Sequence, residues 1–238
     1  MALRVQERTT SSLPAPLTRV LEYVLREVQR EAVWLVPLRV FIGIGWLRAS
    51  AEKLSNPAWW DGAALRAFMD THANLAVFPM FAQLMRGAFT DLAVPLGIIV
   101  MLLEVVIGVF LVLGWWMRSA ILAGGFLNVL FVIAGVPNPS AFYLVIQMAL
   151  WTMGADRAFA FRPRRSRTRR AHTDVSFPLH LISSALWLAL AVSSFGRVRD
   201  FSAGGSIHDP AAVLTVVACV GFGYAVIALL RALQHPRA

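Results

Sequence analysis

The residues that could take part in chemistry are charged side chains in and beside long apolar segments. Arg39 and Lys53 share one helical stripe with Gly43 and Trp46, because they follow one another at spacings of four, three and seven residues. At 1.5 Å per residue, Arg39 and Lys53 are roughly 21 Å apart along the helix axis. We therefore expect Arg39 in the inner half of a membrane span and Lys53 at its outer end. Gly43 would let a neighbouring helix approach closely.

A carboxylate lies near the middle of another apolar segment, residues 92–113. Glu104 would cost several kcal/mol there if it were ionised and unpaired. Arg39 is the only basic residue expected at a comparable depth, so the sequence predicts a buried Arg39–Glu104 ion pair. Two interpretations stay open. The pair either fixes the packing of two helices or forms a site for a proton or a ligand.

Cationic and tryptophan side chains gather at the expected outer end of the first span. A belt of tryptophans at the membrane interface is one interpretation. A site for a small anion or for a flat ring such as a quinone is the other, since cations and tryptophan faces can hold both. The residues of this candidate site are Trp46, Arg48, Lys53, Trp59 and Trp60.

Motifs of established enzyme chemistry are absent from the sequence. It contains no Ser-His-Asp arrangement, no phosphate-binding glycine loop, no zinc motif and no flavin motif. Its single cysteine, Cys219, excludes an internal disulfide and a CxxC redox pair. We expect no metal site, and the catalytic residues are unknown. Asn128 and Gln147 are polar residues in apolar segments, and hydrogen bonding between helices explains both.

Composition indicates the elements that must position these residues. Of the 238 residues, 58% are hydrophobic, and the mean hydropathy is +0.65. We therefore expect an all-α integral membrane protein that contacts the lipid bilayer. The six expected spans are residues 33–51, 92–113, 119–136, 139–154, 177–195 and 211–233.

Residues outside the spans complete the organisation. An amphipathic helix is expected over 16–32, and short helices are expected in the connection 55–91. A cleaved signal peptide is not expected, because Arg39 and Arg48 interrupt the first apolar run. The expected units are a tail with an amphipathic helix (1–32), a four-helix transmembrane module (33–156), an Arg-rich linker (157–174) and a two-helix extension (175–238).

The distribution of basic residues predicts the topology. With six alternating spans, fifteen of the 22 Arg and Lys residues fall on one side, seven of them within 157–170. Basic loops stay in the cytoplasm. Both termini are therefore expected to be cytoplasmic, in a bacterial-type inner membrane. The net charge of +9 is attributed to topology and anionic lipid, and no nucleic-acid partner is expected.

Two short motifs resemble those of the DoxX-like membrane protein family. The first has Arg39 and Gly43, followed by Lys53 within Glu-Lys-Leu and then Asn-Pro. The second has Glu104 and Gly108, followed by Arg118. The resemblance implies a DoxX-like four-helix bundle over 33–156, to which this chain adds two transmembrane helices. It also implies that Gly43, Lys53, Gly108 and Arg118 are signature residues.

The resemblance also suggests a function, because the family includes the DoxD-type small subunit of thiosulfate:quinone oxidoreductase. On that basis the expected function is an accessory membrane subunit of a quinone-linked redox complex. Reduced sulfur compounds such as thiosulfate are the suggested substrates, and a second protein subunit is the expected partner. Whether the chain is itself an enzyme stays open. The alternative is a non-catalytic scaffold that docks soluble redox or stress-response enzymes.

Overall fold

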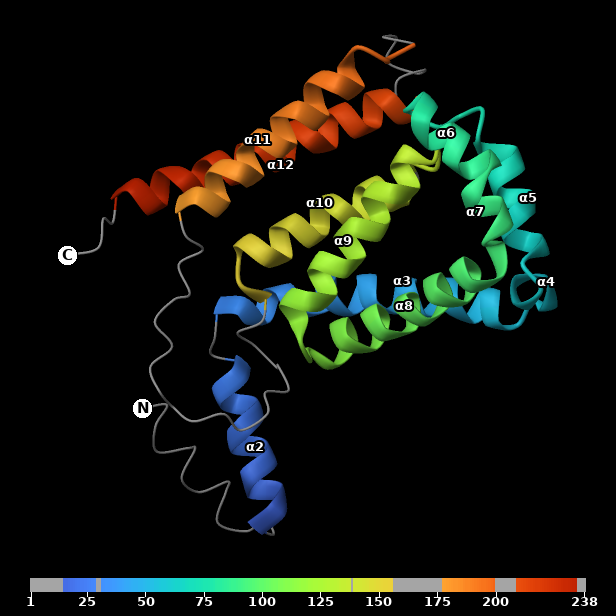
Figure 1. The fold of residues 1–238 in the computed structure, drawn as a ribbon. Coiled ribbons are helices and arrows are strands. Elements are labelled where there is room, and N and C mark those ends of the chain that lie inside the picture. The colour runs from blue at the N-terminus through green and yellow to red at the C-terminus, as the bar shows by residue number, and fades with distance from the viewer. Residues whose placement is uncertain (1–14, 29–30, 138, 156–176, 200–208, 235–238) are drawn as a thin grey trace.

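Every regular element that the structure describes is a helix (Figure 1). The computed structural model describes residues 15–28, 31–137, 139–155, 177–199 and 209–234. The expected Arg-rich linker, 157–174, lies outside the described residues, as does part of the expected N-terminal unit. The elements are α2 (Ala15–Val28), η1 (Glu31–Leu35), α3 (Val36–Leu54), α4 (Pro57–Trp60), α5 (Ala63–His72), α6 (Pro79–Arg86), α7 (Ala88–Asp91), α8 (Ala93–Leu113), α9 (Met117–Ile133), α10 (Ser140–Thr152), α11 (Phe177–Phe195) and α12 (Pro210–Gln234).

Four of the described helices are long and apolar enough to cross a membrane. They are the segments Val33–Leu54, Ala93–Leu113, Pro178–Phe195 and Pro210–Ile227. Helices α9 and α10 are also apolar, but they have only 17 and 13 residues. At 1.5 Å per residue, α10 is about 20 Å long, which is shorter than a hydrocarbon layer of about 30 Å. The protein is thus a helical membrane protein, and four of the six expected spans have a sufficient length.

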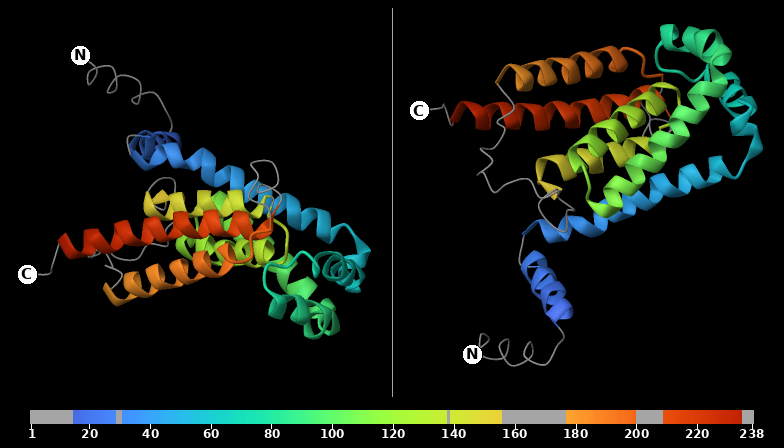
Figure 2. Two further views of the ribbon diagram at one scale, coloured as in Figure 1. Left: turned by 90° about the horizontal axis from the view of Figure 1, so that it is seen from above. Right: turned by 60° about the horizontal axis from the view of Figure 1, so that its bottom comes forward.

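The long helices form two groups that pack against each other (Figures 1 and 2). Helices α3 and α8 pack side by side, α8 packs on α9, and α9 packs on α10. Helices α11 and α12 form a pair, and α12 lies against α9 and α10. The four short helices α4–α7, here called the cap, lie at one end of the molecule. Helix α2 and the end of α12 lie at the other end.

Glycines allow α3 and α8 to pack closely. A Cβ atom built at Gly108 would lie 2.9 Å from the carbonyl oxygen of Gly43 and 2.7 Å from Cγ of Leu47. A Cβ atom at Gly43 would lie 2.7 Å from Cγ2 of Val112. These contacts leave no room for a larger side chain, so the two backbones touch as small residues permit in membrane helices.

The cap is built by local turn chemistry and by its own apolar cluster. The side chain of Asn56 accepts a hydrogen bond from the Ala58 N–H, and Pro57 takes the first position of α4. Gly62 begins α5 with a φ of +77°, a conformation that glycine adopts without strain. Buried side chains of the cap, including Met69 and Met85, pack on the first turn of α8. The connection after α3 is therefore structured and fixed to the long helices.

Candidate functional site

A buried ion pair joins α3 to α8. The Lys53 ammonium lies 2.8 Å from one carboxylate oxygen of Glu104 and 2.9 Å from the other. The side chain of Glu104 is 1% exposed and that of Lys53 is 17% exposed. The Lys53 nitrogen also lies 5.3 Å from the ring centroid of Trp59, over the ring. One cation therefore contacts both a carboxylate and an aromatic face where little water can reach.

The predicted Arg39–Glu104 pair is wrong, because Lys53 binds the Glu104 carboxylate. The reason is the antiparallel packing of α3 and α8, in which Gly43 lies opposite Gly108. Arg39 precedes Gly43 by four residues and Glu104 precedes Gly108 by four, so the two offsets add to eight residues, about 12 Å along the axis. Arg39 is nevertheless buried, at 2% exposed.

The length and direction of the Lys53 side chain let its ammonium group reach Glu104. Side chains of a helix lean toward its N-terminus, and this direction carries the Lys53 ammonium back toward Glu104. A long stem buried along apolar surface with a charged end is typical of lysine at a membrane interface.

The structure brings together only part of the predicted outer site. Lys53 and Trp59 are in contact, as described above. The guanidinium of Arg48 forms an exposed ion pair with Glu52 instead, at 2.9 Å. Trp60 is exposed and its Nε1 donates a hydrogen bond to the carbonyl oxygen of Leu54.

Trp46, the remaining member of the predicted outer site, is separate from the others. It is buried in the core beside Tyr143, with 6.4 Å between ring centroids. The predicted site is therefore divided: Trp46 lies in the core, Arg48 and Trp60 make surface contacts, and Lys53 contacts Trp59.

The predicted signature residues have distinct structural positions. Gly43 and Gly108 form the close contact between α3 and α8. Arg118 lies in the first turn of α9, and its guanidinium lies over the ring of Trp151, 5.6 Å from the centroid. Trp151 belongs to α10 and also lines a groove between the two groups of long helices. Arg118 thus contacts one residue of the groove lining.

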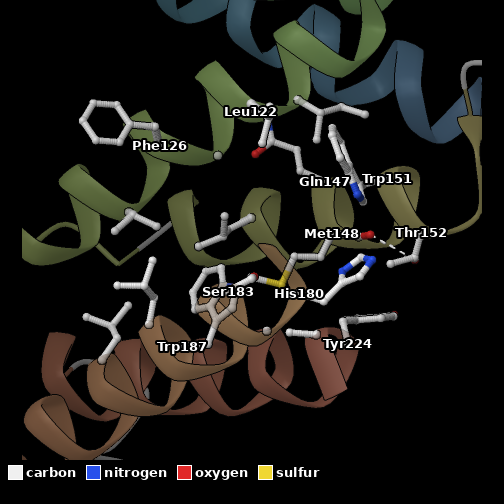
Figure 3. Close-up of a pocket in the computed structure, with 18 of the residues that line it drawn as sticks. Leu122, Phe126, Gln147, Met148, Trp151, Thr152, His180, Ser183, Trp187 and Tyr224 are labelled. Atoms are coloured by element: carbon white, nitrogen blue, oxygen red, sulfur yellow. Dashed lines mark hydrogen bonds between the residues drawn. The ribbon is translucent and has the colours of Figure 1, made fainter. Parts of the chain in front are cut away.

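This lateral groove lies between α9 and α10 on one side and α11 and α12 on the other (Figure 3). Its volume is about 700 Å³, within the usual range for small-molecule sites. Most of its lining is aliphatic or aromatic, with Phe126, Trp151 and Trp187 supplying ring faces. The groove is therefore a mostly apolar cavity between the two groups of long helices.

A few polar groups face this groove. The Asn128 Nδ2 donates a hydrogen bond of 3.0 Å to the Gln147 Oε1, which fixes the Gln147 amide and confirms the expected bond between helices. The Gln147 Nε2 is buried, has no hydrogen-bond partner among the described residues and lies against Gly124, which does not line the groove. His180 and Tyr224 line the same groove near Thr152. The lining thus offers hydrogen-bond donors to a ligand that carries acceptors.

The sequence did not reveal this groove. Its walls come from helices separated by many residues, and the segment between α10 and α11 gives no spacing that would relate them. Gln147 was visible as a polar residue in an apolar run, and His180 as an isolated histidine. Only the packing of α12 on α9 and α10 places these residues around one space.

Comparison with known proteins gives no match: no protein-family model, no curated protein sequence and no solved structure is similar to this chain.

Proposed function

We propose that the protein is an accessory membrane subunit of a quinone-linked redox complex and that the lateral groove holds the quinone. The observation that carries this proposal is the lateral groove itself, whose mostly apolar lining includes the rings of Trp151 and Trp187 and the polar side chains of His180 and Tyr224. A groove of this kind suits a ligand with a flat ring, an apolar tail and a few hydrogen-bond acceptors.

The chemistry of a quinone matches the lining of the groove. A quinone head is a flat ring with carbonyl acceptors, and its isoprenoid tail is apolar. Trp151 and Trp187 offer ring faces, while Gln147, His180 and Tyr224 offer polar groups. One wall of the groove is formed by α11 and α12, which are long and apolar enough to cross a membrane, so a ligand dissolved in lipid could enter the groove sideways.

The residues of this chain would bind and orient the ring rather than transfer electrons alone. When bound, the quinone supplies two-electron redox chemistry. Tyr224 would donate a hydrogen bond to one carbonyl group, His180 would hold or move a proton near the other, and the apolar walls would exclude water. Electrons would come from a second subunit, with reduced sulfur compounds such as thiosulfate as the proposed donors. Membership of a DoxX-like family remains part of the proposal, and the motifs around Gly43 and Gly108 support it.

The groove can be tested by filling it. A Cβ atom at Gly125 would meet only ordinary contacts, at 3.5 Å or more, so a larger side chain there would project into the groove. We expect purified Gly125→Leu protein to lose co-extracted quinone and to lose quenching of tryptophan fluorescence by added quinone. His180→Leu should weaken quinone binding about tenfold, as expected for loss of one hydrogen bond of about 1.4 kcal/mol.

Gly223→Leu is the matched control, because Gly223 is also within a helix, has open space around it and does not line the groove. Wild-type and Gly223→Leu proteins should bind quinone alike. Equal binding by the Gly125→Leu protein, or retention of phospholipid without quinone by the wild type, would contradict the proposal.

Affinity purification from native membranes separates the quinone-linked subunit from the non-catalytic scaffold. A redox subunit supports the quinone-linked complex, and a soluble enzyme bound to a quinone-free protein supports the scaffold.

A further inference from the structure

A second cavity lies where the cap meets α11 and α12. Its volume is about 760 Å³. The walls are the loop 73–77, part of α6, the residues 196–199 after α11 and the first residues of α12. Among the described lining residues, none is shared with the lateral groove. The two cavities are therefore separate sites, at different places in the fold.

Three arginines dominate the charge of this cavity. Arg86 comes from the last turn of α6, and Arg197 and Arg199 follow α11. The one carboxylate among the described lining residues is that of Asp209. Among the described lining residues, three positive charges against one negative charge give a net charge of +2. A hollow lined by charge of one sign raises the local concentration of ions of the opposite sign.

The Asp209 carboxylate is engaged with the main chain. One oxygen accepts a hydrogen bond from the Arg199 N–H at 2.6 Å, and the other accepts one from the Ala211 N–H at 2.9 Å. This buried carboxylate therefore caps the start of α12 and ties the segment after α11 to it. It builds the wall of the cavity, and the described structure shows no salt bridge from it to the three guanidinium groups.

Uncharged partners hold two of the guanidinium groups in place. The Arg86 Nη2 donates to the Asn74 Oδ1 at 2.6 Å. The Arg197 guanidinium lies over the ring of Phe78, 5.1 Å from the centroid. Neither contact neutralises the positive charge, and a guanidinium has five N–H donors. These groups are thus positioned, charged and able to donate further hydrogen bonds, which lowers the entropic cost of binding an anion.

We propose that this arginine cavity binds an oxyanion of the phosphate or sulfate class through Arg86, Arg197 and Arg199. Arginine suits this chemistry because its planar fork of N–H groups matches two oxygens of such an anion. The oxyanion is either free in solution or the head group of an anionic phospholipid, since the cavity lies at one end of the long helices. The proposal shares no residue with the quinone site and does not depend on it.

The test uses the full chain in nanodiscs. In zwitterionic lipid, inorganic phosphate should raise the thermal unfolding midpoint more than sodium chloride of equal ionic strength. In discs containing phosphatidylglycerol, native mass spectrometry should show retained phosphatidylglycerol if a lipid head group is bound. Arg86→Gln and Arg197→Gln should each weaken the binding that is seen at least tenfold, because glutamine keeps a polar side chain without the charge.

Two further variants make the outcome decisive. Arg66→Gln is the matched control, since Arg66 belongs to the cap but binds the carbonyl oxygen of Asp61 outside the cavity; its binding should equal that of the wild type. Arg197→Lys should recover part of the binding lost in Arg197→Gln, because it restores the charge without the planar fork, and this separates loss of charge from misfolding. Protection by phosphate identifies a free anion, and retained phosphatidylglycerol identifies a lipid. Protection by neither, or equal binding by wild type and the Arg86→Gln and Arg197→Gln variants, overturns the proposal.

Discussion

At the scale of single residues, the buried Lys53–Glu104 pair should control stability. Lys53→Met leaves a buried carboxylate without its cation, and we expect a loss of about 3–5 kcal/mol in the free energy of unfolding. Lys53→Met combined with Glu104→Met should lose less than the sum of the two single variants, because the pair acts as a unit. Unfolding in mixed detergent micelles measures each value.

The exposed Arg48–Glu52 pair provides the control for this cycle. Arg48→Met should cost less than about 1 kcal/mol, since water screens an exposed ion pair. Additive losses for Lys53→Met and Glu104→Met would show that the two side chains do not stabilise one another.

His72 in the cap should make the stability depend on pH. Burial lowers the pKa of His72 below its ordinary value of about 6.5, and the Phe68 ring lies 4.5 Å from its own ring. The unfolded chain then binds a proton more readily than the folded chain, so this contribution is present above pH 6.5 and is lost as the pH falls below it. The unfolding midpoint of the wild type should fall more between pH 7.5 and 5.5 than that of His72→Phe. Equal falls would exclude this role for His72.

Residue types alone could identify the charged groups but not their pairing. Glu104 was recognisable as a carboxylate that needs a cation, and a buried ion pair is present. The choice between Arg39 and Lys53 depended on how α3 and α8 are aligned, and on the direction in which the lysine stem leans. The spacing of residues within one helix determines neither the alignment of the two helices nor the direction of the lysine side chain.

At the scale of elements, the contact of α3 with α8 depends on the absence of side chains. Gly108→Ala would place a Cβ atom 2.9 Å from the Gly43 carbonyl oxygen, a backbone atom that cannot move aside easily. We expect a loss of about 1–3 kcal/mol from overpacking. Gly223→Ala should be neutral or stabilising, because its Cβ meets open space and alanine favours helix. A Gly108→Ala protein as stable as Gly223→Ala would rule out the close backbone contact.

The helices themselves were largely predictable from hydrophobic pattern. Each of the six expected apolar segments contains a helix, and the connection 55–91 contains the short helices of the cap. The segment 119–136 ends as helix earlier than expected, at Ile133, and Gly135 then adopts a φ of +92°. The apolar composition continues through this turn, so hydropathy does not show where the helix ends. A glycine with positive φ directly after the helix marks its end.

At the scale of the whole molecule, the cap and α2 lie at opposite ends of the long helices. With the basic side in the cytoplasm, the cap should face outward. In a Cys219→Ala background, a membrane-impermeant maleimide added to intact cells should label Ala63→Cys on α5 and not Glu22→Cys on α2. The opposite labelling pattern would reverse the topology.

The cavities were the least predictable part. Arg86 and Arg197 are more than a hundred residues apart in the sequence, and Gln147 and Tyr224 are separated by the entire segment between α10 and α11. A sequence gives each of these side chains a helix or a loop. It does not give the packing of one helix group on another, which places them around a common space.

The Lys53–Glu104 pair has a consequence for how the protein is made. Its two residues are 51 positions apart, so α3 leaves the ribosome well before α8 is complete. The first span has a mean hydropathy of only 1.3, against 3.0 for α8. Before α8 is made, the Lys53 charge on α3 has no carboxylate partner. Release of α3 into lipid on its own is therefore unfavourable. We expect it to wait at the insertion machinery until α8 arrives, and the two helices to enter the bilayer as a pair.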